Sequence, residues 1–243
     1  MGNTLTIFRR ELGSYFTSPI AYIFVCLFLV FMGVFPFLVF GFFERTTPDL
    51  RQYFDFFNFA FVILVPPLTM RLWSEERKSG TIELLMTFPF RSWEVVVGKY
   101  LASYVVVGVT LLLTLTVPIS IGTVLELDWG VITASYIGAF LIAGVCLAIG
   151  SWASAITENQ IVALLVSIVV LAVLAAVGFP GVSEKFETIV GGLAQFLRWF
   201  GFYSHYENFV RGVINPVDVV YVVTLTAFFL VLNNFAVELR KFR

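Results

Sequence analysis

The stretch from Val131 to Ile156 has the sequence VITASYIGAFLIAGVCLAIGSWASAI and contains no Asp, Glu, Lys, Arg or His. A helix that crosses the hydrocarbon core of a bilayer, roughly 30 Å thick, needs about 20 mainly apolar residues. Only a helix satisfies its own backbone hydrogen bonds there. Small residues also recur at four-residue spacing, in the sets Ser135 with Ala139 and Ala143, Gly144 with Ala148, and Gly150 with Ser154. The stretch therefore predicts a membrane-spanning helix whose small residues allow close packing against another helix.

Five other stretches have the same character: Ile20 to Phe43, Phe56 to Leu72, Val95 to Leu125, Ile161 to Phe179, and Val217 to Val237. Of the 243 residues, 59% are hydrophobic and only 13% are charged, whereas a soluble domain averages about 25% charged residues. We therefore expect an all-α membrane protein with six transmembrane helices in a single domain, residues 1–243. Pro66-Pro67 should kink the second span.

The ends of several spans carry capping signals. Asn215-Pro216 before the last span, like Ser18-Pro19 before the first, places a side-chain acceptor ahead of a proline at the first helical position. Thr157 with Gln160 has the spacing of a capping box and predicts the start of the fifth span.

The distribution of lysine and arginine predicts the orientation, because positively charged segments resist translocation. With both termini in the cytoplasm, the cytoplasmic side holds ten of the 15: Arg9, Arg10, Arg71, Arg77, Lys78, Arg91, Lys99, Arg240, Lys241 and Arg243. We therefore expect a multi-pass protein of the bacterial inner (plasma) membrane, surrounded by lipid, with both termini cytoplasmic. The net charge of -1 argues against nucleic acid as a partner.

Two amphipathic segments lie outside the spans. In residues 1–17, apolar residues recur at helical spacing against Arg9 and Arg10, which predicts an N-terminal interfacial helix. A mere flank of the first span is the alternative. In the extracytoplasmic segment 181–212, the pattern from Ser183 to Phe200 predicts an outer amphipathic helix before the last span.

The sequence predicts no catalytic and no metal-binding residue. His205 is the only histidine, and a single His without a Cys partner makes a poor metal site. Ser204 with Glu207 has capping-box spacing, so the start of a helix is the preferred interpretation of this segment over a metal or substrate site.

The cytoplasmic segment between the second and third spans carries the most information. A dense mixed-charge run ends at Gly80 and is followed by a short amphipathic helix, Thr81 to Phe88, with Ile82, Leu85 and Met86 as its apolar stripe. Such a short helix needs a surface to dock on. An ordinary charged loop is the alternative on physical grounds alone.

This segment resembles the cytoplasmic signature of ABC-2-type permeases. The matching residues are Glu76, Gly80, Thr81, Glu83, Leu84, Leu85, Pro89, Gly98 and Lys99. The stretch from Arg10 to Ile23 further resembles the permease of the gliding-motility-type ABC transporter.

The resemblance implies a permease subunit whose coupling segment, residues 75–90, docks on an ATPase. The implied ATPase-coupling residues are Glu76, Gly80, Thr81, Ile82, Glu83, Leu84, Leu85 and Pro89. The implied partners are a second permease subunit in a homo- or heterodimer, two cytoplasmic ABC ATPase subunits that bind ATP and Mg, and a periplasmic-domain auxiliary protein. The chain itself has no Gly-x-x-x-x-Gly-Lys-Ser/Thr phosphate loop and needs no cofactor of its own. The alternatives are a non-transporting anchor or mechanical coupling partner, and a lipid-modifying membrane enzyme.

The centres of the spans lack ionisable residues, which favours an ATP-driven cycle over ion coupling. Thr110, Thr114 and Ser120 in the third span are candidates for lining a pathway. Ser and Thr in helices commonly bond to their own helix instead.

Overall fold

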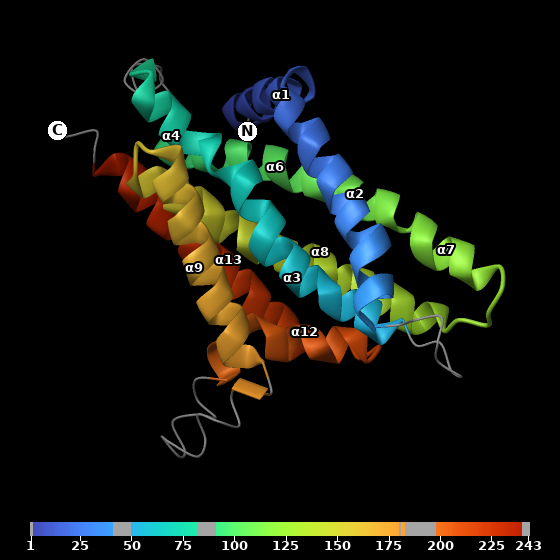
Figure 1. The fold of residues 1–243 in the computed structure, drawn as a ribbon. Helices are drawn as coiled ribbons and strands as arrows, with labels where there is room; N and C mark the ends of the chain where they lie inside the picture. The colour runs from blue at the N-terminus through green and yellow to red at the C-terminus, as the bar shows by residue number, and fades with distance from the viewer. Residues whose placement is uncertain (1, 41–49, 82–90, 180, 183–197, 240–243) are drawn as a thin grey trace.

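The computed structural model describes residues 2–40, 50–81, 91–179, 181–182 and 198–239, and these residues form helices and no strand (Figure 1). The helices are α1 (Gly2–Thr17), α2 (Pro19–Phe40), α3 (Arg51–Thr69), α4 (Arg71–Lys78), α6 (Ser92–Thr114), α7 (Thr116–Gly122), α8 (Trp129–Ile156), α9 (Gln160–Gly178), α12 (Phe202–Val210) and α13 (Pro216–Glu238).

Six of the described helical stretches are long and apolar enough to cross a membrane: Pro19–Leu38, Arg51–Lys78, Ser92–Gly122, Trp129–Ile156, Gln160–Gly178 and Pro216–Glu238. The prediction of an all-α protein with six transmembrane helices is confirmed. The segment predicted as an outer amphipathic helix lies largely outside the described residues.

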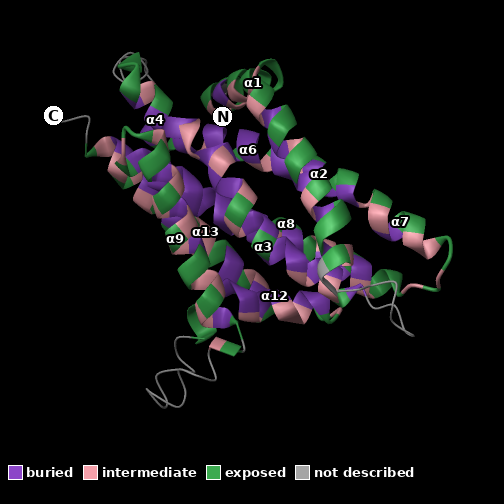
Figure 2. Cartoon of the chain, viewed as in Figure 1, coloured by how far each residue is buried: buried purple, intermediate pink, exposed green. Residues whose placement is uncertain are grey.

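Helix α8 forms the centre of the bundle. It contacts α3, α4, α6, α9, α12 and α13, and its side chains are largely buried (Figure 2). The small residues of α8 make this possible: a Cβ added to Gly150 would lie 2.1 Å from Oγ1 of Thr69 on α3. A Cβ on Gly138 would lie 2.5 Å from Cβ of Phe209 on α12. The close packing that the four-residue spacing of Gly150 predicted therefore occurs within this chain.

The second span extends beyond its predicted limits at both ends, from Arg51 to Lys78, and the kink at Pro66-Pro67 stays a prediction. Pro66 and Pro67 lie inside α3, and the helix continues past them to Thr69. After the single residue Met70, α4 extends the chain in helical form through the mixed-charge run (Figure 1). The first part of the predicted coupling segment is thus a helical extension of the second span.

Two capping predictions are wrong and two are confirmed. Ser18 accepts from the N–H of Ile20 at 3.4 Å in the first turn of α2. Asn215 caps α13 by accepting from the N–H of Val217, as expected. Helix α9 is capped by Asn159, whose side chain accepts from Ile161 N–H, and not by Thr157. Helix α12 begins after Gly201, and Ser204 lies within it, donating its hydroxyl proton to the Gly201 carbonyl. Asparagine competes well with threonine as a cap, which explains the shift in α9.

Helix α1 packs against α6 and α2 at the end of the bundle that also carries α4 (Figure 1). One close approach is at Gly98 of α6, where an added Cβ would lie 2.9 Å from Cγ2 of Ile7. Leu5 and Phe16 of the predicted apolar face are exposed, while Leu12 and Tyr15 pack on the core. The segment 1–17 is therefore a helix, and its position in a membrane interface stays a prediction.

Candidate functional site: the junction of α1, α4 and α6

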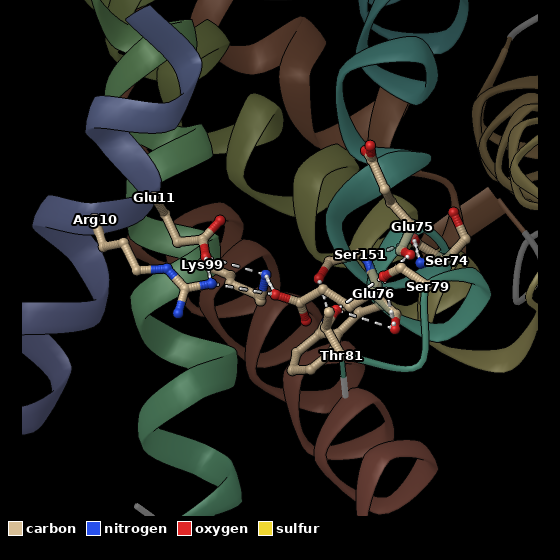
Figure 3. Close-up of polar contacts among 11 residues, drawn as sticks. Arg10, Glu11, Ser74, Glu75, Glu76, Ser79, Thr81, Lys99 and Ser151 are labelled. Atoms are coloured by element: carbon tan, nitrogen blue, oxygen red, sulfur yellow. Dashed lines mark hydrogen bonds and ion pairs between the residues drawn. The ribbon is translucent and has the colours of Figure 1, made fainter. Parts of the chain in front are cut away.

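Lys99 lies at the centre of a charged cluster that joins three helices (Figure 3). Its Nζ atom is 2.9 Å from Oε1 of Glu76 on α4 and 3.3 Å from Oε1 of Glu11 on α1. Arg10 of α1 adds a longer contact, 3.7 Å from Nη2 to Oε1 of Glu76. We call Arg10, Glu11, Glu76 and Lys99 the junction cluster.

Burial makes the junction cluster more than a surface ion pair. The Lys99 residue is only 2% exposed, and a buried ammonium ion is tolerated only when opposite charges and hydrogen bonds replace its water. Glu11 and Glu76 supply that charge. The Nζ atom also lies over the Trp73 ring, 5.3 Å from its centroid, within the range of a cation–π interaction. Lys99 is thereby fixed against α1 and α4 at once.

The preceding residue explains why a Gly-Lys pair stands here. Gly98 permits the close contact with Ile7 on α1, and this contact brings the α1 backbone near enough for Glu11 to reach Lys99. The pair Gly98-Lys99, singled out from the sequence, therefore serves to hold α1 against α6. Sequence reasoning identified both residues but not the α1 residues that they contact, Ile7 and Glu11.

A cavity of about 340 Å³ borders the junction cluster. Its wall includes Arg71 and Glu75 from α4 and Tyr15 from α1. Burial, with Glu11 nearby, raises the pKa of Tyr15 above its ordinary value, so its hydroxyl stays protonated. Oε2 of Glu76 has no hydrogen-bond partner among the described residues. The junction can therefore accept one more hydrogen bond at Glu76.

A second polar contact joins α4 to the central helix. Ser154 of α8 accepts hydrogen bonds from the backbone N–H groups of Trp73 and Ser74, at 3.1 and 3.2 Å, and donates to the Met70 carbonyl at 2.8 Å. The first N–H groups of a helix have no partner within it. Ser154 thus caps α4 from another helix.

The contact continues through Ser151, one turn earlier on α8. Its hydroxyl accepts from Trp73 Nε1 at 3.3 Å and from Asn233 Nδ2 of α13 at 2.7 Å. All three residues are buried. Helix α4 is therefore bonded to both α8 and α13 through side chains that have no water to replace these bonds.

Three of the predicted coupling residues lie within the described chain. Glu76 belongs to the junction cluster, Gly80 has φ of 70°, and Thr81 donates its hydroxyl proton to the Glu76 carbonyl at 3.3 Å. Gly80 is suited to a left-handed position that ends a helix. Ile82, Glu83, Leu84, Leu85 and Pro89 lie outside the described residues, and their coupling role stays a prediction.

The pathway candidates bond to their own helices. The hydroxyl of Thr110 donates to the Val106 carbonyl at 2.8 Å, Thr114 to Leu111 at 2.7 Å, and Ser120 to Thr116 at 2.7 Å. Thr110 and Thr114 are also buried within the bundle. These bonds agree with the alternative interpretation, and a pathway role for the three residues stays a prediction.

A buried polar cluster at the opposite end of the bundle was not expected. His205 Nδ1 lies 2.6 Å from Oδ1 of Asp218, its Nε2 lies 2.9 Å from the Trp199 carbonyl, and Asn208 donates to Oδ2 of Asp218 at 2.8 Å. His205 and Asp218 are 5% and 3% exposed. The cluster ties α12 to the start of α13. The sequence feature that could have indicated this cluster is Asp218, an acidic residue in the first turn of a predicted span. Among the described residues, no three His, Cys, Asp or Glu side chains gather as a metal site.

Comparison with known families identifies the family of the chain. The model of a family described as ABC-2 family transporter protein matches residues 45–237. The matched region includes α4, Lys99 and the central helix. It leaves out the stretch from Arg10 to Ile23, so it does not support the narrower resemblance to a gliding-motility permease. No curated protein sequence matches the chain.

Proposed function

Since the chain belongs to the ABC-2 transporter family and is thus a permease subunit of an ABC transporter, we propose that it couples ATP hydrolysis by separate ATPase subunits to movement of a substrate. The membrane is the bacterial inner membrane, with both termini in the cytoplasm. Two ATPase subunits bind the ATP and Mg. A second permease subunit completes the membrane domain, and a periplasmic-domain protein is an auxiliary partner.

The observation that carries the proposal is the junction cluster. Helix α4 leads through Gly80 directly into residues 82–90, which contain the predicted ATPase-docking stripe. Lys99 fixes α4 to the start of α6, which follows that stripe in sequence, and to α1. Both ends of the docking segment are therefore anchored on one cluster, so displacement of the segment by the ATPase would move α4, α6 and α1 together.

Hydrogen bonds from α4 to α8 connect the junction cluster to the centre of the bundle. Trp73 and Ser74 are bonded to Ser154, and Trp73 to Ser151, on the central helix α8. Because these bonds are buried, separating α4 from α8 would leave polar groups unsatisfied. Movement of α4 together with α8 as one rigid body keeps these bonds and therefore costs less free energy than separating the two helices. This agrees with an ATP-driven cycle that rearranges whole helices.

Replacement of Leu85 by Asp tests the docking role. The chain is co-expressed and purified with a candidate ABC ATPase, and both retention of the ATPase and ATP hydrolysis in proteoliposomes are measured. A charge placed in an apolar contact costs several kcal/mol when it is fully desolvated. We therefore expect Leu85→Asp to lose the ATPase while the chain still inserts and keeps its helical content.

Thr87→Asp is the matched control, because Thr87 lies off the predicted apolar stripe and should retain the ATPase. Glu83→Gln should weaken coupling by about 1 kcal/mol, the range of exposed to partly buried charge pairs. If Leu85→Asp binds the ATPase as tightly as the unaltered chain and retains full hydrolysis, residues 82–90 are not the docking segment.

A further inference from the structure

The cavity of about 340 Å³ beside the junction cluster has a wall rich in charge. It lies at the end of the bundle that carries α1 and α4 (Figure 1). Its volume falls within the range found for ligand pockets, about 300–1,000 Å³. Polar atoms make up the larger part of its exposed wall, and three basic and three acidic residues line it. A ligand in this cavity therefore meets both signs of charge.

The junction cluster balances its own charge. Its two basic and two acidic residues face one another across distances of 2.9 to 3.7 Å. The two lining charges that remain are Arg71 and Glu75 of α4. Neither forms an ion pair with another described residue, and Nε of Arg71 has no hydrogen-bond partner among these residues. One cation and one anion on the same wall are therefore available to a ligand.

The order of these two charges along α4 is informative. Arg71 and Glu75 are one turn apart and share one side of the helix. Arg71 is half-buried and Glu75 is exposed. Arg71 is the first charged residue after Asp55 in the second span, so it marks the end of the apolar stretch. Glu75 lies about 6 Å further along the helix, at 1.5 Å per residue. From the membrane outward, the wall therefore presents first a cation and then an anion.

Residues of two spans and of α1 complete the wall. Ile20 of α2 and Leu68 of α3 line the cavity, and both belong to membrane-spanning stretches. Ser14 and Tyr15 of α1 line it as well, and each carries a hydroxyl group that can donate a hydrogen bond. The cavity thus joins a charged wall to apolar side chains at the border of the bilayer, an arrangement that suits the headgroup of a lipid.

We propose that this cavity binds the headgroup of a zwitterionic phospholipid of the phosphatidylethanolamine class. The phosphate pairs with the guanidinium of Arg71, whose planar fork matches phosphate oxygens. The ammonium group donates to the carboxylate of Glu75, and the acyl chains pass Ile20 and Leu68 into the bilayer. In such a lipid the phosphate lies between the acyl chains and the ammonium group, which is the order of Arg71 and Glu75 from the apolar stretch outward. The site does not depend on the coupling role proposed above.

Native mass spectrometry of the full chain in detergent micelles tests the proposal. The delipidated chain receives, one at a time, lipids with identical dioleoyl chains and a phosphoethanolamine, phosphocholine or phosphoglycerol headgroup. The choline group keeps the positive charge but has no N–H to donate, and the glycerol group has no positive charge. We expect the ethanolamine lipid to be retained most strongly. Arg71→Gln and Glu75→Gln should each reduce its retention by about tenfold, the equivalent of one lost hydrogen bond to a charged group.

The two variants should differ in their selectivity. Glu75→Gln should remove the preference for the ethanolamine lipid over the glycerol lipid, because only the ammonium group needs the carboxylate. Arg71→Gln should weaken retention of all three lipids, because all three carry the phosphate. Arg9→Gln is the matched control: Arg9 is exposed on α1 and does not line the cavity, so this change should leave the preference intact. Circular dichroism confirms that the variants keep their helical content.

A charge exchange and a soluble competitor complete the test. Arg71→Glu combined with Glu75→Arg keeps the net charge but reverses the order of the charges, and it should abolish the preference. Glycerophosphoethanolamine, which has the same headgroup without acyl chains, should fail to displace the lipid at equal concentration. Equal retention of the three lipids, a preference that survives the charge exchange, or displacement by the soluble compound would overturn the proposal.

Discussion

Lys99→Met should destabilise the fold through the junction cluster. The substitution keeps most of the side-chain volume and removes the charge that two carboxylates share. Glu11 and Glu76 would then face each other across the vacated position, since each places its Oε1 within 3.3 Å of the same nitrogen. Removing one partner of a buried pair costs about 3–5 kcal/mol.

We expect the lower end of that range for Lys99→Met, about 3 kcal/mol, because the side chains of Glu11 and Glu76 keep 14% and 16% exposure. Unfolding by SDS titration in mixed micelles, followed by circular dichroism, measures the free energy of unfolding. The control is Arg10→Gln. The Arg10 side chain is 64% exposed, so this change should cost less than about 1 kcal/mol.

A combined variant identifies the cause. Adding Glu11→Gln and Glu76→Gln to Lys99→Met removes the two unpaired charges and should restore most of the lost stability, because neutral amides are cheaper to bury than carboxylates. Unchanged stability in Lys99→Met, or no recovery in the combined variant, would refute the view that Lys99 neutralises two buried carboxylates.

Three further predictions follow from the packing, the opposite polar cluster and the charge distribution. Gly150→Ala should lower the free energy of unfolding by about 1–3 kcal/mol in the same titration, because its Cβ meets Thr69. Gly33→Ala, with open space around it, should be neutral or stabilising. Equal effects of the two changes would contradict this prediction. Asp218→Leu should cost about 1–3 kcal/mol by leaving buried donors without an acceptor, and stability like that of the unaltered chain would exclude a structural role. A reporter active only in the cytoplasm should work when fused after Ser79 and fail after Asp128, and the reverse result would invert the topology.

The sequence predicted the spans because their signal is local. Each apolar run is long enough by itself to cross a membrane, so the limits of the last three spans agree with α8, α9 and α13 within about two residues, the usual uncertainty of helix ends. Caps were less predictable. Thr157 and Asn159 both accept from a backbone N–H, of Asn159 and of Ile161 respectively. Only the path of the chain after α8 decides that the N–H in the first turn of α9 meets Asn159.

For the candidate site, the sequence supplied Glu76, Gly98 and Lys99 but none of their contacts across helices. Glu11 lies far from Lys99 in sequence and joins it only because α1 folds back against α6 at Gly98. Ser154 was predicted as a small packing residue, whereas in the bundle it caps α4. His205 was predicted at a helix start, and its partner Asp218 belongs to the next helix.

The sequence alone therefore determined that this chain is a six-span helical membrane protein with a charged segment between its second and third spans. Hydrophobic length and composition are properties of a continuous stretch, and the bilayer acts on each stretch separately. Only the tertiary structure decided which polar groups meet, because a buried hydrogen bond or ion pair depends on distances of about 3 Å between separate helices.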